Sequence, residues 1–323
     1  MYRSISISGI LTLDLHALNN EGTEGNTMMT RMVDIVDKEG KRATVNAISG
    51  DMFKHIQAEH LFHEAETMQL PLCAGCRLFD ANRIGADNEF KEGFRAGATN
   101  EEILEKLVNR CVLDDCEGIL LTGNIGGNPR SLARKSCVEF GWVVGLPEST
   151  TTDSYFHAKY VPERGKGSGQ EENLGQNIFH RPASSGQYAA VVCVDLYRVG
   201  RNDISLKYVL NEDERKKRIG ALLRSILHTF IRPTGAQRNT QNPHVVDFRG
   251  VITASRSAMP APCISGLNSD FENEIEQLCQ TLNKLSEASS EQQKPIDLFA
   301  FKSLSEFGKS METLIQSLSN GGV

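Results

Sequence analysis

Two pairs of cysteines have the clearest chemical spacing in this chain. Cys73 and Cys76 form a C-x-x-C motif shortly after Pro71, and two thiolates at this spacing on a turn can bind one metal ion. Cys111 and Cys116 form a second, more widely spaced pair. The four thiols together predict a structural zinc site, although the looser second pair also suits buried cysteines that bind no metal.

Histidines near these cysteines leave a second interpretation open. His55, His60 and His63 could replace one zinc ligand, but neither H-E-x-x-H nor its inverse is present. The chain also lacks a nucleotide-hydrolysis loop, a dinucleotide-binding glycine motif and a nucleophile elbow. We therefore expect that the chain is not an enzyme. The alternative is a metal-dependent nuclease or hydrolase that uses the histidines and cysteines of residues 55–116.

The composition is that of an ordinary folded protein. Of 323 residues, 39% are hydrophobic and 24% are charged, and no apolar run has the length of a membrane span or a signal peptide. We expect a cytoplasmic protein without membrane contact, whose eight cysteines are not in disulfides. The net charge is −6, yet residues 181–256 hold thirteen Lys and Arg against six Asp and Glu, which permits a nucleic-acid face.

The first element of the chain is a predicted strand followed by a polar loop. Apolar residues alternate with others from residue 4 to residue 16, at Ile5, Ile7, Leu11, Leu13 and Leu15. This period of two predicts a half-buried strand. Residues 17–26 then carry two glycines and three asparagines. Such a loop suits either a solvated turn or backbone N–H groups that meet an anion.

Further periodicity predicts the elements that position the remaining groups. Helices are expected from about Asp51, from Thr99 and over residues 211–230, and two acidic amphipathic helices follow within residues 269–323. Strands are expected over 117–123, 137–144, 188–197 and 244–255. Strands and helices with long insertions predict an α+β fold, an antiparallel sheet with helices on one face, for which a ferredoxin-like arrangement would fit.

Several short runs place a polar or cationic side chain beside a glycine or another small residue. These runs are residues 49–55, 123–128, 134–136, 176–181 and 234–238. Jointly they supply amides and cations for phosphates and a few aromatic rings for bases, which is what a protein that binds an RNA backbone needs.

The order of these runs resembles the DevR-type CRISPR-associated autoregulator family of the RAMP superfamily. The resemblance lies in residues 7–31, 48–60, 134–142, 176–189 and 235–240, and it spans residues 5 to about 260. It departs at Asp114–Gly118, where a Cys-Asp-x-His-Gly-like run is expected, and at Asn239, where a serine is more usual.

This resemblance implies a backbone subunit of a type I Cascade complex that polymerises along a CRISPR guide RNA (crRNA). It implies an RRM-like palm, a helical finger insertion and a β-hairpin thumb in one composite domain. The palm would comprise about 1–50, 110–147 and 188–268, the fingers 51–109 and the thumb 148–187. It does not account for residues 269–323. Its implied partners are the crRNA, target DNA, other copies of the chain in a helical filament and other Cascade subunits.

Chemistry and resemblance together imply a set of RNA-binding residues. They are Asn19, Asn20, Asn26, Arg31, Lys54, His55, Arg134, Lys135, Ser136, Gln176, Phe179, Arg181, Gly235 and Arg238. Phe179 would stack or wedge against a kinked base, or else pack inside the thumb hairpin. A transcriptional role, which the family's autoregulator name suggests, would need specific duplex binding, and no helix-turn-helix signal supports it.

Overall fold

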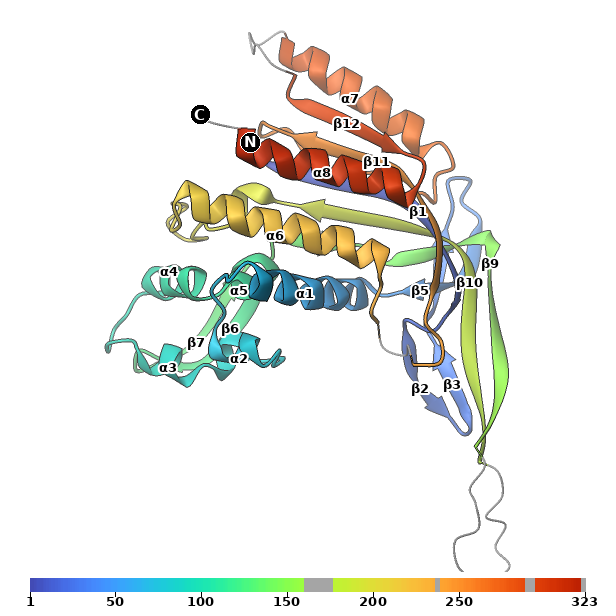
Figure 1. Cartoon of the computed structure of the whole chain (residues 1–323), viewed down its shortest axis with the longest axis horizontal. Coiled ribbons are helices and arrows are strands. Elements are labelled where there is room, and N and C mark those ends of the chain that lie inside the picture. Colours follow the sequence, from blue (N-terminus) through green and yellow to red (C-terminus); the bar gives the residue numbers. More distant parts are fainter. Residues whose placement is uncertain (160–176, 236–238, 288–293, 321–323) are drawn as a thin grey trace, which may run out of the picture.

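A large antiparallel sheet forms the centre of the computed structural model, which describes residues 1–159, 177–235, 239–287 and 294–320 (Figure 1). The sheet path runs in the order β12 (Ile296–Phe301), β11 (His244–Ser255), β1 (Ser4–His16), β10 (Asn177–Val194), β9 (Val143–Lys159), β5 (Arg42–Ile48) and β4 (Met32–Val36). Off this path, β8 (Val138–Phe140) pairs with β10, and β2 (Asn20–Glu24) pairs with β3 (Thr27–Thr30). The prediction of an α+β protein built on an antiparallel sheet is confirmed.

Helices cover both faces of this sheet. Ile5, Ile7, Leu11 and Leu13 of β1 share one hydrophobic core with α1 (Gly50–Thr67), α6 (Glu212–Ile231) and α8 (Leu304–Asn320). Ile10 of β1 belongs instead to a second core with α7 (Phe271–Glu287). The expectation of helices on one face is therefore wrong, because alternate apolar residues of β1 serve two cores. The order β11-β1-β10-β9 is compatible with the ferredoxin-like expectation, which stays a prediction.

The predicted inward position of Leu15 is also wrong. The register of β1 shifts between Leu13 and His16, and Leu15 has a φ of 52° and is 48% exposed. A bulge of this kind moves the following residue to the other face of the strand. His16 thus turns into the core, where its ring lies 5.1 Å from the ring of Tyr188.

A helical lobe projects from one end of the helical layer. It comprises α2 (Ala74–Arg77), η1 (Arg83–Ala86), α3 (Asn88–Glu92), α4 (Asn100–Arg110), α5 (Val112–Glu117) and the hairpin of β6 (Ile119–Ile125) and β7 (Asn128–Arg134). Thr99 and Glu102 form a capping box at the start of α4. Within the range 51–109 expected for the fingers, α1 packs against α6, and the part after it forms this lobe.

A β-hairpin, here called the arm, projects at the other end. The arm is the outer part of β9 and β10, from Thr150 to Lys159 and from Asn177 to Gly186, and the β2–β3 hairpin lies beside it (Figure 1). The range 148–187 expected for the thumb includes the arm, whereas residues 160–176 fall outside the described residues. Strand β12 and the 3₁₀ turn η2 (Leu196–Arg198) were not predicted. Among the described residues, no helix has the length and apolar character needed to cross a membrane.

Candidate nucleic-acid interface

Aromatic and cationic side chains gather on the arm. Phe179 pairs across the hairpin with His157, and Arg181 pairs with Tyr155. The rings of His157 and Phe179 are stacked with centroids 5.7 Å apart, and the Arg181 guanidinium lies 4.8 Å from the Phe179 ring centre. Because cross-strand partners lie on the same side of a hairpin, these four side chains share one face of the arm.

The opposite face of the arm carries a second ring pair. His180 pairs with Phe156 across the strands, and their ring centroids are 6.0 Å apart. Phe156 is 60% exposed. The His180 N–H donates to the carbonyl of Asn26 at 2.9 Å, which ties the arm to the turn of the β2–β3 hairpin. Exposed rings beside cations can stack on nucleic-acid bases and hold phosphates.

The segment after α6 supports the base of the arm. Arg181 Nη1 donates to Thr240 Oγ1 at 3.1 Å, and Gln241 Nε2 donates to the Pro182 carbonyl at 2.9 Å. Gly235 is buried, and a Cβ atom there would lie 3.0 Å from a side-chain carbon of Leu18. Gly235 therefore has a packing role. Two of the predicted contacts, Gln176 and Arg238, lie outside the described residues.

The first predicted loop becomes a junction between β1, the β2–β3 hairpin and α1. Asn19 is buried; its Oδ1 accepts from Ser49 N at 2.7 Å and its carbonyl accepts from Arg31 N at 3.0 Å. Asn20 begins β2, and Asn26 is exposed at the turn. Asn19 thus positions its neighbours, while Asn26 presents its side chain to solvent.

Arg31 and Trp142 form the exposed part of this junction. The Arg31 guanidinium is paired with Glu21 and lies 5.3 Å from the centre of the Trp142 ring. Trp142 is 42% exposed. A ring and a cation side by side suit a stacked base with its phosphate.

Two adjoining grooves continue this surface along α1. The first has a volume of about 260 Å³ and is lined by Trp142, Lys54, Asp51 and Glu139 among others. The second, of about 310 Å³, shares Asp51 and Lys54 and adds His55. Since both grooves include Lys54, they link Trp142 at the junction to His55 on α1.

Lys54 is held between these grooves by hydrogen bonds. Its Nζ donates to Ser136 Oγ at 2.6 Å and to the Val138 carbonyl at 3.4 Å. Burial lowers the pKa of Lys54, and the nearby charge of Glu117, which would raise it, only partly offsets this effect. Burial also raises the pKa of Glu117 to about 6. Lys54 and Ser136, which belong to separate runs of the sequence, therefore lie together. Lys135, which precedes Ser136 in the chain, is exposed.

The prediction that Arg134 contacts RNA is wrong. Arg134 is only 2% exposed, and it pairs with Asp115 at 2.7 Å. Its guanidinium also donates to the carbonyls of Arg198 and Arg201, both at 2.8 Å. Burial alone would lower the pKa of Arg134, but the charges of Asp115 and Asp203 and the hydrogen bond to Asp203 act together against burial, and the pKa is raised. The alternation of β7 turns this side chain into the protein, so Arg134 is structural.

Cys116 is likewise absent from the metal-type cluster. Among the described residues, Cys73, Cys76, Cys111 and Asp114 bring one ligand atom each within 4.8 Å of the others. Hydrogen bonds from Cys111 and Cys76 lower the pKa of the Cys73 thiol to about 5. Cys116 is buried but lies five residues beyond Cys111, outside the cluster. Asp114, three residues beyond Cys111 and thus about one helical turn along, takes the fourth position that was predicted for Cys116.

The histidines predicted as alternative ligands do not join this cluster. His60 Nε2 lies 2.9 Å from the Arg232 carbonyl, and the ring of His55 lies 5.6 Å from that of Phe79. The cysteines are buried, whereas His55 and His63 are exposed. Among the described residues the groups of the alternative hydrolase therefore do not meet in one open site.

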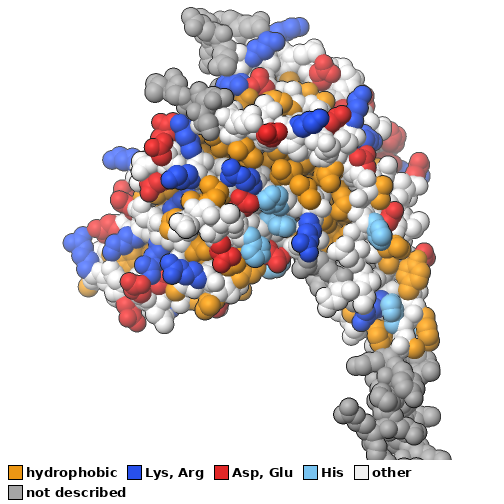
Figure 2. Space-filling view, in the orientation of Figure 1, with side chains coloured by type: hydrophobic (Ala, Val, Ile, Leu, Met, Phe, Trp, Pro, Cys, Tyr) orange, Lys and Arg blue, Asp and Glu red, His pale blue; other side chains and the backbone are white. Residues whose placement is uncertain are grey.

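A wide hollow separates the helical lobe from the arm (Figure 2). Its surface carries hydrophobic, histidine and cationic side chains in the orientation shown. Sequence reasoning missed Tyr155, Phe156, His157, His180 and Trp142. The first four become visible only when β9 is paired with β10, because sequence periodicity does not reveal which residues of the two strands lie opposite each other.

The fold and this surface define a class: mixed α/β proteins in which one antiparallel sheet carries a helical lobe and an aromatic hairpin arm. The sequence model of the CRISPR-associated negative auto-regulator DevR/Csa2 family matches residues 7–276, and the chain belongs to this family. A relative from Methanocaldococcus jannaschii, "CRISPR-associated protein Cas7/Cst2/DevR", is 23% identical over 297 residues, which cover 87% of this chain and 90% of the relative.

A solved structure supports the fold over the whole chain. A chain of a "CRISPR RNA-guided surveillance complex, pre-nicking" superposes with a TM-score of 0.51 at 12% identity and covers 98% of this chain and 100% of its own length. The recognition of a DevR-type family is thereby confirmed.

Proposed function

We propose that this chain is a non-catalytic backbone subunit of a Cascade-type complex and that it binds a CRISPR guide RNA. The observation that carries the proposal is the arm, whose two faces present stacked and exposed rings beside Arg181. Membership of the DevR/Csa2 family and the likeness to a surveillance-complex chain support the same function.

The junction and the grooves along α1 are the proposed track for the RNA backbone. Arg31, Lys54 and His55 supply cations and a polar ring along one continuous surface. Lys54 and Arg31 have protein partners that fix their positions before RNA arrives, which lowers the entropic cost of binding. Contacts to phosphates and sugars hold an RNA without reading its sequence.

The arm is the proposed device that separates groups of bases. A ring such as Phe156 can stack on an unpaired base irrespective of its identity. An arm that crosses to the next copy of the chain would kink the guide at a fixed interval, and the bases between kinks would remain free to pair with target DNA. Pairing, and not the protein, then reads the target sequence. Such a complex works in the cytoplasm with further Cascade subunits.

Arm substitutions test this function. Purified chain is titrated into fluorescently labelled single-stranded RNA that carries a CRISPR repeat. We expect the double variant Phe156→Ala with Phe179→Ala to weaken binding by roughly tenfold or more, because stacking contributes about 1–3 kcal/mol per base. The control is Phe299→Ala on β12, a phenylalanine that is partly buried as Phe179 is but lies away from the arm. Equal affinity of the arm variant and wild type would contradict the proposed role.

A further inference from the structure

We propose that Cys73, Cys76, Cys111 and Asp114 bind a structural Zn²⁺ ion inside the helical lobe. Asp114 Oδ2 lies 3.3 Å from Cys73 Sγ and 3.6 Å from Cys76 Sγ. In a tetrahedral site with Zn–S of about 2.3 Å and Zn–O of about 2.1 Å, neighbouring ligand atoms lie roughly 3.6–3.8 Å apart. All four ligand atoms lie within 4.8 Å of one another, so small side-chain shifts would bring them to the spacing that zinc requires.

The Asp114 carboxylate is an independent indication of a cation. Asp114 is fully buried, and its Oδ1 has no hydrogen-bond partner among the described residues. Its Oδ2 contacts the thiols of Cys73 and Cys76. A buried carboxylate that meets only weak thiol donors is costly, and a bound cation would remove that cost.

The backbone around the cluster is built for close approach. A Cβ atom at Gly75 would lie 2.0 Å from the Arg83 carbonyl oxygen, so only glycine fits between the two cysteines of the C-x-x-C motif at this position. The N–H of Cys76 donates to Cys73 Sγ at 3.3 Å. The two thiols are thus oriented toward one point by the turn itself.

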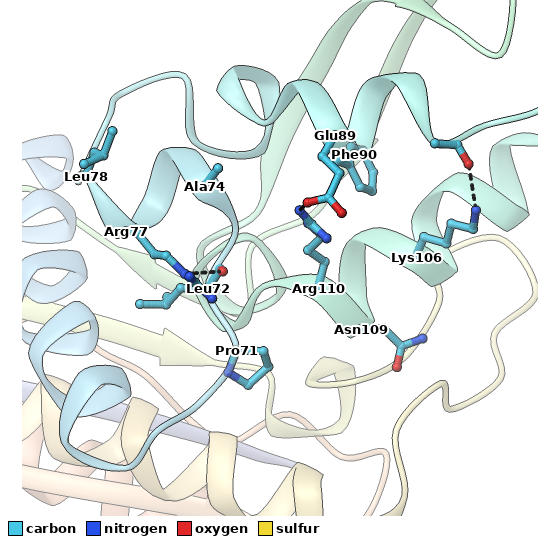
Figure 3. Close-up of a pocket in the computed structure, with 11 residues that line it drawn as sticks. Pro71, Leu72, Ala74, Arg77, Leu78, Glu89, Phe90, Lys106, Asn109 and Arg110 are labelled. Carbon is cyan, nitrogen blue, oxygen red and sulfur yellow. Dashed lines mark hydrogen bonds and ion pairs between the residues drawn. The ribbon is translucent and has the colours of Figure 1, made fainter.

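Supporting contacts tie together the two segments that carry ligands. Val112 N donates to the Pro71 carbonyl at 2.9 Å. The Asp87 carboxylate accepts from Ala74 N at 3.0 Å and from Arg110 Nε at 2.8 Å. Arg110 also meets Glu89 at the wall of a groove on the outer side of this region (Figure 3). Such second-layer contacts hold metal ligands in place and sustain affinity.

The burial of the cluster indicates a structural ion instead of a catalytic one. Each of the four ligand side chains is at most 1% exposed, and four protein ligands leave no open position for a substrate. Cys76 also lines the groove that contains Lys54 and His55, which provides an entry path for the ion. The ion would join α2 to the start of α5 and brace that side of the groove.

Metal content tests the proposal in the full chain. The protein is produced with zinc in the medium, freed of any histidine tag and analysed by inductively coupled plasma mass spectrometry. We expect about one zinc per chain in wild type. Cys111→Ser should lose the zinc, whereas Cys116→Ser should retain it, because Cys116, in the helix that Cys111 caps, is equally buried but lies outside the cluster. Wild type without stoichiometric zinc, or zinc retained in Cys111→Ser, would overturn the assignment.

Cobalt substitution keeps the test valid if Cys111→Ser does not fold. Wild type refilled with Co²⁺ should show the visible bands of a tetrahedral ion and strong thiolate-to-cobalt absorption in the near ultraviolet. Asp114→Asn should release zinc to a chelator roughly tenfold faster or more. Bands of an octahedral ion, or a brown iron-containing protein, would refute a zinc site. If purified wild type contains no zinc and still binds RNA, this inference is rejected and the proposed function stands.

Discussion

Individual side chains divide into those that face a ligand and those that hold the protein together. Arg134 and Lys135 are adjacent in sequence, yet Arg134 is buried against Asp115 and Lys135 is exposed. Asp115 also pairs with Arg218 at 2.8 Å, so one carboxylate holds β7 and α6 together. A cationic run in sequence thus contains both a structural residue and a surface residue.

Substitution of these two neighbours separates the two roles. Arg134→Ala should lower the free energy of unfolding by about 3–5 kcal/mol, because it breaks a buried ion pair and leaves carbonyl groups without their donor. Lys135→Ala should change the free energy of unfolding by less than about 0.5 kcal/mol. Urea unfolding followed by circular dichroism measures both. A stable Arg134→Ala protein that has lost only RNA binding would show that the buried assignment is incorrect.

At the scale of elements, β1 carries a titratable group in the core. The bulge near Leu15 buries His16, and burial lowers the pKa of His16 from 6.5 to about 4. The unfolded chain therefore binds a proton at His16 between these pH values while the native chain does not. Stability must rise with pH across this window and be lost as the pH falls from about 6.5 to about 4.

His16→Gln should remove this part of the pH dependence. We expect the loss of stability between pH 6.5 and pH 4 to shrink by about 3 kcal/mol in the variant, since each pKa unit corresponds to about 1.4 kcal/mol. Urea unfolding at several pH values gives the change in the free energy of unfolding with pH. This change is not affected by a loss of stability that the substitution causes equally at every pH. His63→Gln, an exposed change on α1, is the control. Parallel pH profiles for wild type and His16→Gln would contradict the assignment.

The elements show what the sequence could predict and what it could not. Periodicity predicted β1, α1, α4, α6 and β11 because each has a continuous apolar pattern that one or two cores require. It missed β12, a short strand between the two C-terminal helices. It also misplaced Leu15, because a bulge changes the facing of a strand without changing its composition.

The candidate site was harder to predict than the elements for a physical reason. Lys54, His55 and Arg31 could be named as candidates from the sequence because they lie beside glycine-bearing turns in the family-like runs, and their RNA contacts remain a prediction. Trp142 and Phe156 were missed because their role depends on register between strands far apart in sequence. For the same reason Asp114 could not be distinguished from Cys116 as the fourth member of the cysteine cluster until the fold was known.

At the scale of the whole molecule, two projecting parts flank one centre, which is the arrangement that the proposed repeating subunit would need. The sheet and its helices form the centre, while the helical lobe and the arm project from it on either side of a hollow (Figures 1 and 2). This separation of a centre from projecting parts suits a subunit that repeats along an RNA strand.

Sequencing of co-purified RNA is the decisive test of whether the chain binds guide RNA. The chain is expressed with a CRISPR array, purified at moderate salt, and its RNA is extracted and sequenced. We expect repeat-derived guides, uncleaved and strongly enriched over total cellular RNA. Purification without RNA, or with RNA that mirrors the cellular pool, would contradict guide-RNA binding.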